Sequence, residues 1–169
     1  MIRPMRRPYI KKLSIAMTAG ALALTLSACT GAGPNAATRL IKRVTDGNEA
    51  SVTTNGNDLS ITNLLLVATE DGSAVVVGTI VNHAATADAL LGIAAGGTTA
   101  KLTGEQNLVQ DKPIRFEGDS ANAKAVFAGV GAQAGKNVKL SLAFARAGVV
   151  TVDAIIRDKR DTYANITSK

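Results

Sequence analysis

The sequence contains very few of the side chains that bind metals or perform catalysis on their own. Its 169 residues include one cysteine (Cys29), one histidine (His83) and no tryptophan, and its three methionines all lie within the first 17 positions. Residues 30–169 therefore offer no thiolate or thioether and only one imidazole, which excludes the usual multi-ligand sites for zinc, copper or iron. The aromatic content of 3% also argues against base stacking or an aromatic carbohydrate platform.

Acidic residues are missing from the first 28 positions, and this asymmetry accounts for the net charge of +6. Of the 19 basic residues, five precede residue 13: Arg3, Arg6, Arg7, Lys11 and Lys12. The remaining 14 basic residues face 13 acidic ones, which leaves a net charge of +1 for residues 29–169. Because the positive charge belongs to the N-terminal segment, we expect no nucleic-acid partner.

The basic segment is followed by fourteen uncharged residues, LSIAMTAGALALTL, at positions 13–26. This run is shorter than the roughly 20 residues of a membrane-spanning helix, but it fits the apolar region of a secretory signal. The next residues, Ser27, Ala28 and Cys29, resemble the bacterial lipobox, whose cysteine receives a diacylglycerol thioether before the leader is removed. Small residues fit the peptidase cleft, and the alkyl transfer needs a sulfur nucleophile.

We therefore predict a lipoprotein signal peptide over residues 1–28 and an S-diacylglycerol cysteine, with N-acylation also possible, at Cys29. This modification would anchor the protein in the cell membrane on its extracytoplasmic face. The alternative is an ordinary cysteine that follows an A-x-A-type cleavage site.

The export route has two candidates. The stretch RRPYIK, residues 6–11, is similar to the twin-arginine signal Arg-Arg-x-Phe-Leu-Lys, although Met5 stands where Ser or Thr is usual. The other interpretation, which we favour, is a Sec leader that contains paired arginines. On the twin-arginine route the domain would cross the membrane already folded.

A change of pattern near residue 51 marks the start of the predicted domain. Residues 29–50 contain Gly31, Gly33 and Pro34 and suit a flexible tether. Residues 51–157 contain short runs of Val, Leu, Ile and Thr between turn residues, which predicts an all-β sandwich, cupredoxin-like or immunoglobulin-like. Strands are expected at 58–68, 73–82, 88–95, 98–102, 122–130, 136–145 and 148–156.

Two of these expectations concern burial and edges. The run 73–82 is apolar on both faces, so we expect a central strand. Pro113 excludes a central strand from residues 108–121, which we interpret as an edge segment and loop. The last residues, 158–169, are predicted to form a charged tail with little to pack.

His83 is the only candidate for acid–base catalysis in the predicted domain. It follows a predicted strand, and Asp88 lies five residues further on, so a Ser-His-Asp arrangement is one hypothesis. No G-x-S-x-G elbow accompanies it, and a polar loop histidine is the favoured interpretation. Asp111, Glu117 and Asp119 lack the spacing of a calcium loop, and we interpret them as unrelated loop acids.

The stretch GVGAQAGKN, residues 129–137, is superficially similar to a phosphate-binding loop. Val130 stands at the position of the first Walker glycine, and Asn137 at that of the hydroxyl residue. The stretch also precedes a predicted strand instead of a helix, so no helix N-terminus is available to bind an anion. We interpret it as a glycine-rich turn between strands.

Two longer stretches carry a family resemblance. GTIVNHAATADALLGIAA (78–95) and GKNVKLSLAFARAGVVTVDAII (135–156) are similar to segments of the PCu(A)C-type periplasmic copper chaperones and related actinobacterial lipoproteins. The resemblance covers roughly residues 58–156 and implies a cupredoxin-like β-sandwich, which the strand pattern predicts without it.

The resemblance also implies where copper ligands would lie. The family binds Cu(I) through an upstream His and Met and a His-x-Met pair, which falls near Lys124–Val126 here, while residues 98–110 contain no His or Met. We therefore expect the fold without the metal, and no cofactor. The predicted function is a membrane-anchored, non-enzymatic β-sandwich that binds a protein or envelope partner, its oligomeric state left open. The alternative is a copper-handling or oxidase-assembly accessory role.

Overall fold

The computed structural model describes residues 45–169, and the structural statements below concern that part of the chain. The predicted signal peptide and residues 29–44 of the predicted tether, Cys29 among them, lie outside the described residues. Among the residues that are described, no helix has the length and apolar character needed to span a membrane.

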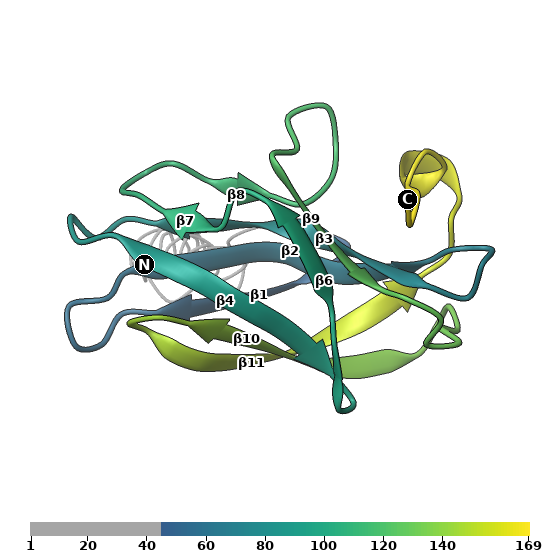
Figure 1. Ribbon diagram of the computed structural model, residues 1–169, viewed down its shortest axis with the longest axis horizontal. Helices are drawn as coiled ribbons and strands as arrows, with labels where there is room; N and C mark the ends of the chain where they lie inside the picture. The colour runs from purple at the N-terminus through teal and green to yellow at the C-terminus, as the bar shows by residue number, and fades with distance from the viewer. Residues whose placement is uncertain (1–44) are drawn as a thin grey trace, which may run out of the picture. The chain divides into compact units, whose positions relative to one another are not determined.

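Eleven strands and one short 3-10 helix, η2, make up the described part of the chain (Figure 1). The prediction of an all-β sandwich is confirmed. The strands and the 3-10 helix have the bounds β1 Asn48–Val52, β2 Leu59–Ala68, β3 Ala74–Asn82, β4 Asp88–Ala95, β5 Thr98–Thr99, β6 Lys101–Gly104, β7 Asn107–Leu108, β8 Ile114–Arg115, β9 Ala123–Phe127, β10 Asn137–Phe144, β11 Gly148–Arg157 and η2 Asp161–Tyr163.

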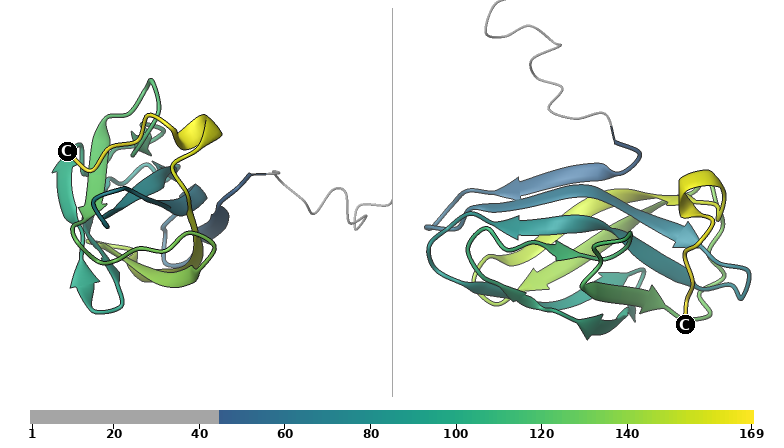
Figure 2. Two further views of the ribbon diagram at one scale, coloured as in Figure 1. Left: turned by 90° about the vertical axis from the view of Figure 1, so that its right-hand side faces the viewer. Right: turned by 90° about the horizontal axis from the view of Figure 1, so that it is seen from above.

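The β2–β3 hairpin lies at the centre of the strand order. Hydrogen-bonded strands follow one another as β5-β4-β10-β11-β2-β3-β9-β6, with β1 beside β2, β7 beside β4 and β8 beside β3. The strands pair antiparallel except β11 and β2, which run parallel where Ile156 meets Leu66. Only Ala100 separates β5 from β6, the two ends of this order. The sandwich is therefore nearly closed around one core, as the end-on view in Figure 2 shows.

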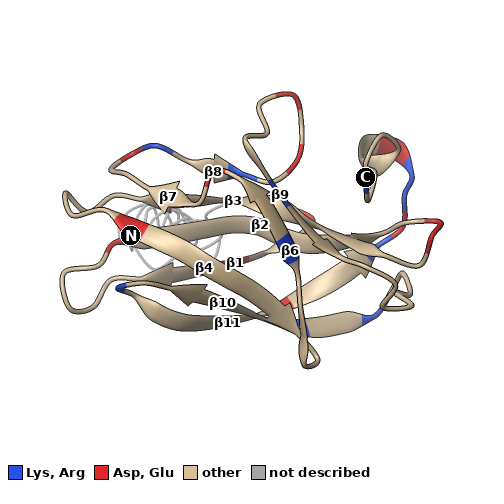
Figure 3. Ribbon diagram, in the orientation of Figure 1, with Lys and Arg blue, Asp and Glu red and all other residues tan. Residues whose placement is uncertain are grey.

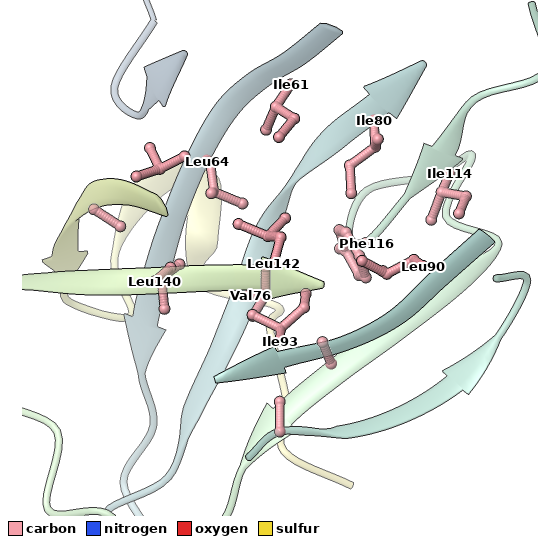
Figure 4. Close-up of a cluster of buried hydrophobic side chains, with 14 of the residues drawn as sticks. Ile61, Leu64, Val76, Ile80, Leu90, Ile93, Ile114, Phe116, Leu140 and Leu142 are labelled. Atoms are coloured by element: carbon pink, nitrogen blue, oxygen red, sulfur yellow. The ribbon is translucent and has the colours of Figure 1, made fainter. Parts of the chain in front are cut away.

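The core is filled by alternate side chains of both layers. In β10, Leu140, Leu142 and Phe144 are buried, whereas the intervening Lys139 and Ser141 face outward, as the alternation predicts. Figure 4 shows side chains from β2, β3, β4 and β10 converging on one space. Burying each large apolar side chain stabilises the fold by roughly 1.5–3 kcal/mol.

A β-bulge in β2 allows this strand to contribute side chains to the core on both sides of the bulge. The register of the β2–β3 pair shifts at Asn63, so that Ile61 and Leu64 both point into the core. Asn63 has a positive φ of 53° and accepts a hydrogen bond from the backbone N–H of Gly47 at 2.9 Å. A side chain at Gly47 would bring its Cβ within 2.4 Å of the Asn63 backbone carbon, so glycine is required there.

The edge segment predicted around Pro113 is observed as two very short strands. β7 pairs with the start of β4, and β8 pairs with β3 through Ile114 opposite Ile80. The chain between β7 and β8 forms a turn in which the Lys112 N–H donates to the Val109 carbonyl at 3.1 Å. At the N-terminal side, β1 begins at Asn48, three residues before the predicted domain boundary.

The prediction that the C-terminal residues have little to pack is wrong. Tyr163 and Ile166 are buried against the outer face of the β2–β3 hairpin, on a second apolar cluster formed by Leu65, Val67, Val75 and Val77. This packing explains why β3 is apolar on both faces: its inner face meets the core, and its outer face meets the C-terminal segment. Neither β2 nor β3 contains a charged residue (Figure 3).

Candidate functional site

A pocket opens at one end of the sandwich, which we call the open end: the end where β4 stops and β10 and β3 begin. This end lies at the right of Figure 1. The pocket has a volume of about 350 Å³. Its lining residues are Leu66, Ala74, Ala95, Gly96, Thr98, Phe127, Val130, Gly131, Ala132, Gln133, Lys136, Asn137, Val138 and Ile156. Buried core side chains form the floor, so the pocket is a continuation of the hydrophobic core toward solvent.

The loop between β9 and β10 forms one wall of this pocket. The Gly131 N–H donates to the carbonyl of Gly72, in the β2–β3 turn, at 2.9 Å. At its other end, the Gly135 N–H donates to the Ile156 carbonyl and the Ile156 N–H donates to the Lys136 carbonyl, each at 2.8 Å. The loop is thus fixed to the β2–β3 turn and to β11, and it confirms the prediction of a glycine-rich connection between strands.

Glycine is needed within this loop because of its backbone conformation. Gly129, Gly131 and Gly135 have φ values of 61°, 63° and 84°, the left-handed region that other residues rarely adopt. Between Gly129 and Gly131, Val130 remains 42% exposed and lines the pocket. A large apolar side chain that the loop leaves in water is consistent with a binding surface.

The charge of the pocket is positive. Lys136 is its one charged lining residue, and no Asp or Glu is among the lining residues. Thr98, Gln133 and Asn137 add neutral polar groups. The pocket therefore combines an apolar floor with a single cation, an arrangement that suits an apolar ligand with a negative end.

The opposite end of the sandwich, which we call the polar end, is built around two buried polar side chains. Asn82, 1% exposed, donates from Nδ2 to the carbonyls of Thr86 and Leu108, each at 2.9 Å, and its Oδ1 accepts from the Ala84 N–H. These hydrogen bonds hold the β3–β4 connection against β7. Every hydrogen-bonding atom of the Asn82 side chain is used structurally.

Asp88 performs the same role for the β10–β11 hairpin. Its carboxylate, in a residue only 7% exposed, accepts hydrogen bonds from the backbone N–H groups of Ala89, Arg146 and Ala147 at 2.7–3.0 Å. Charge-assisted bonds of this kind are stronger than neutral ones. The carboxylate therefore ties the start of β4 to the turn that joins β10 and β11.

The pairing of His83 with Asp88, the less favoured of the two hypotheses, is not observed. Because backbone N–H groups occupy Asp88, His83 instead lies 2.8 Å from Asp111, between Nδ1 and Oδ1. Both side chains are largely exposed, at 46% and 66%. Exposed pairs contribute little to stability, and this one lies in loops outside the pocket.

The loop acids do not form a metal centre. Within residues 45–169 no group of three or more His, Cys, Asp or Glu side chains is placed to hold a metal ion. Asp111 pairs with His83, while Glu117 and Asp119 line a different hollow beside the C-terminal segment. Partial burial raises the pKa of Glu117, and the nearby Lys124 opposes that shift.

Comparison with known structures identifies the kind of fold. The copper-bound PCuAC domain from PmoF2 matches with a TM-score of 0.54 and 19% identity over 66% of this chain and 98% of that chain. The apo PCuAC domain from PmoF1 matches with 0.53 and 23% over 66% and 99%, and the apo PmoF2 PCuAC domain with 0.53 and 17% over 67% and 96%. No family model and no curated protein matches the sequence. The described part therefore has a PCuAC-like, cupredoxin-like β-sandwich fold.

The positions near which the family's His-x-Met pair was expected lie in β9 and have structural contacts here. Lys124 donates from Nζ to the Lys169 carbonyl oxygen at 2.7 Å and so contacts the C-terminal segment. Val126 packs on the outer apolar cluster beneath Tyr163 and Ile166. The side chains at these two positions thus hold the C-terminal segment in place.

The sequence interpretation missed the pocket although it singled out the loop that forms its wall. Five segments that lie far apart in the chain meet there, and no local sequence pattern indicates that they do. One signal was present in the sequence. Val130 is an apolar residue between two glycines, in a loop where a polar residue would be expected. Cys29, the one site residue predicted from the sequence, lies outside the described residues and stays a prediction.

Proposed function

We propose that this protein is a lipid-anchored extracytoplasmic protein whose β-sandwich binds a partner from the cell envelope without catalysing a reaction. The single observation that carries the anchoring is the order of segments: basic residues, fourteen uncharged residues, then Leu26-Ser27-Ala28-Cys29. A diacylated cysteine supplies two acyl chains, which holds a protein on a membrane far better than one.

The described domain supports the binding role. It has a fixed, hydrogen-bonded polar end and, at its other end, a pocket with an apolar floor. The one histidine has an acid partner but lies in exposed loops, so its geometry favours a surface pair over a proton-transfer site. A rigid scaffold that presents a shaped apolar surface is the usual design of a binding module.

The anchor is tested by replacing the cysteine in the full chain. We expect Cys29→Ser to leave the protein with an uncleaved leader or to release it from the membrane, because oxygen cannot replace sulfur in the thioether. Ser27→Ala is the matched control, since alanine is also found at that lipobox position, and it should stay processed and membrane-bound. Membrane fractionation measures whether each variant stays anchored, and the mass of the N-terminal peptide shows whether the leader has been removed.

One outcome would contradict the anchoring proposal directly. If Cys29→Ser protein is cleaved normally and remains in the membrane fraction, the lipobox assignment is wrong. Anchoring would then have to come from another part of the chain.

Copper handling of the PCuAC type is a second candidate, because a neighbouring structure is a copper-bound PCuAC domain. In this chain His83 and Asp111, 2.8 Å apart, are the groups that could contribute imidazole and carboxylate ligands. Titration of the protein with Cu(I) against a competing chelator tests it. Tight binding that His83→Ala abolishes would support this candidate, whereas no binding would leave the non-metal role.

A further inference from the structure

The pocket at the open end has a floor that only an apolar group can occupy well. Leu66, Ala74 and Phe127 are at most 3% exposed, and Ile156 is 8% exposed. All four contribute to the main core, so a ligand here would contact the core itself. Its volume of about 350 Å³ lies near the lower limit of small-molecule sites, roughly 300–1,000 Å³, and favours one chain over two.

The rim of the pocket selects a negative end group. Lys136 is exposed, and none of the ion pairs found in residues 45–169 includes it. Its backbone is fixed by the Ile156 hydrogen bond, so the ammonium stem starts from a defined point beside the floor. Gln133 and Asn137 provide amide N–H donors on the same rim. With no carboxylate among the lining residues, the rim is complementary to an anion.

From these two observations we propose that the pocket binds a single acyl chain that ends in an anionic head group, such as a fatty-acid carboxylate. The chain lies over Leu66, Phe127 and Ile156, and the carboxylate faces Lys136. This inference deepens the proposed function, on which it rests, by naming the ligand class of the binding domain. Each buried methylene contributes favourable transfer free energy, so the chain supplies the affinity and the lysine the orientation.

The experiment uses the full-length protein in isolated membranes and a hexadecanoate that carries a photoreactive diazirine in its chain. After illumination, the protein is digested with trypsin and the labelled peptide is identified by mass spectrometry. Trypsin cuts after Lys124 and Lys136 and releases residues 125–136, which contain Phe127 and Val130–Gln133 of the pocket. We expect the label in this peptide, displaced by hexadecanoate and not by hexadecylamine.

Two variants with matched controls test the geometry. Ala132→Trp fills the pocket and should reduce labelling by about tenfold, because displacing even two methylenes from an apolar site has that effect. Ala121→Trp, in an exposed loop outside the pocket, is its control and should label like the wild type. Lys136→Glu, in which the tryptic peptide extends to Lys139 because the cut after residue 136 is lost, should reduce labelling by about fivefold, the scale of an exposed ion pair. Lys101→Glu, an exposed cation outside the pocket, should not.

The outcomes separate the two proposals. If the label is found on none of the tryptic peptides that contain Leu66, Phe127 or Ile156, or is displaced equally by the amine, the pocket proposal is overturned while the anchor stands. Unchanged labelling of Lys136→Glu, an exposed substitution that leaves folding intact, overturns the anionic head group. Recovery of the wild-type protein in the soluble fraction contradicts the anchor, and the same labelling then tests the pocket in that fraction.

Discussion

The two ends of the sandwich differ in how the loops that connect the strands are held in place. At the polar end, Asn82 and Asp88 are almost fully buried and saturate the loops around them with hydrogen bonds. At the open end, the loop after β9 is held by hydrogen bonds to Gly72, Ser73 and Ile156, and the core continues to an opening beside Val130. The comparison teaches that buried hydrogen bonds stabilise the polar end, whereas the open end carries the pocket that we propose as a binding site.

The largest effect is expected from removing the carboxylate at the polar end. Asp88→Ala leaves three backbone N–H groups without their acceptor, and we expect the free energy of unfolding to fall by about 3 kcal/mol. Urea denaturation measures it. Asp153→Ala, an exposed acid paired with Lys139, is the control and should change stability by less than about 1 kcal/mol. Equal effects of the two substitutions would show that Asp88 is not a structural clamp.

A somewhat smaller loss is expected at Asn82. Asn82→Ala removes three hydrogen bonds, including the one to the Leu108 carbonyl, and should lower the free energy of unfolding by about 2 kcal/mol. The control is Asn107→Ala, at an exposed position of β7, which should change the free energy of unfolding by less than about 0.5 kcal/mol. Thermal unfolding of both variants measures the two effects. An Asn82 variant as stable as the wild type would show that the Asn82 hydrogen bonds do not stabilise the polar end.

A matched pair of exposed valines contrasts the ends in binding. Val130 at the open end and Val109 in the loop after β7 are 42% and 45% exposed. We expect Val130→Ser and Val109→Ser each to change the free energy of unfolding by less than about 0.5 kcal/mol. Only Val130→Ser should weaken labelling by the photoreactive fatty acid. If both variants label alike, the opening beside Val130 is not the entry to a ligand site.

The smallest effect concerns the turn that supports the open end. Hydrogen bonds from Ser168 and then Thr69 hold the pKa of the Asp71 carboxyl far below its usual range. Ser168→Ala should therefore raise that pKa, which NMR titration of the Asp71 carboxyl reads directly. An unchanged pKa would mean that the C-terminal segment does not contact this turn in solution.

The same pKa shift has a consequence for acid stability. A carboxyl whose pKa is lowered by folding stabilises the protein above its unfolded pKa of about 3.9, and this contribution is lost as the pH falls toward the folded pKa. Wild type should thus lose more stability than Ser168→Ala when the pH is lowered from about 5 to about 2. Denaturation at these pH values measures the difference.

The strands were predictable because their signals are local. The alternation in 137–144 and the two-faced apolar run in 74–82 predict β10 and a central β3 directly. The hydrogen bonds of the Asp88 carboxylate were not predictable, since the N–H groups at 146 and 147 that donate to it lie 58 and 59 residues away along the chain. The pocket was missed for the same reason: Leu66, Phe127 and Ile156, which line it, come together only after folding.

The covering of the β2–β3 hairpin could have been inferred more fully. A central strand that is apolar on both faces needs a second partner, and Tyr163 and Ile166, three positions apart, were the apolar residues remaining in the last segment. Their charged neighbours obscured this signal. The general lesson is that an excess of apolar faces among the strands predicts that an apparently polar segment packs on them.

That packing also determines when folding can finish. Val75 and Tyr163 belong to one apolar cluster although 88 positions separate them, so the contact forms only after nearly the whole chain is available. If the chain is exported unfolded, the outer face of the β2–β3 hairpin stays exposed until Tyr163 and Ile166 have crossed the membrane, a period in which aggregation competes with folding. A chain exported in the folded state completes this contact in the compartment where it is made.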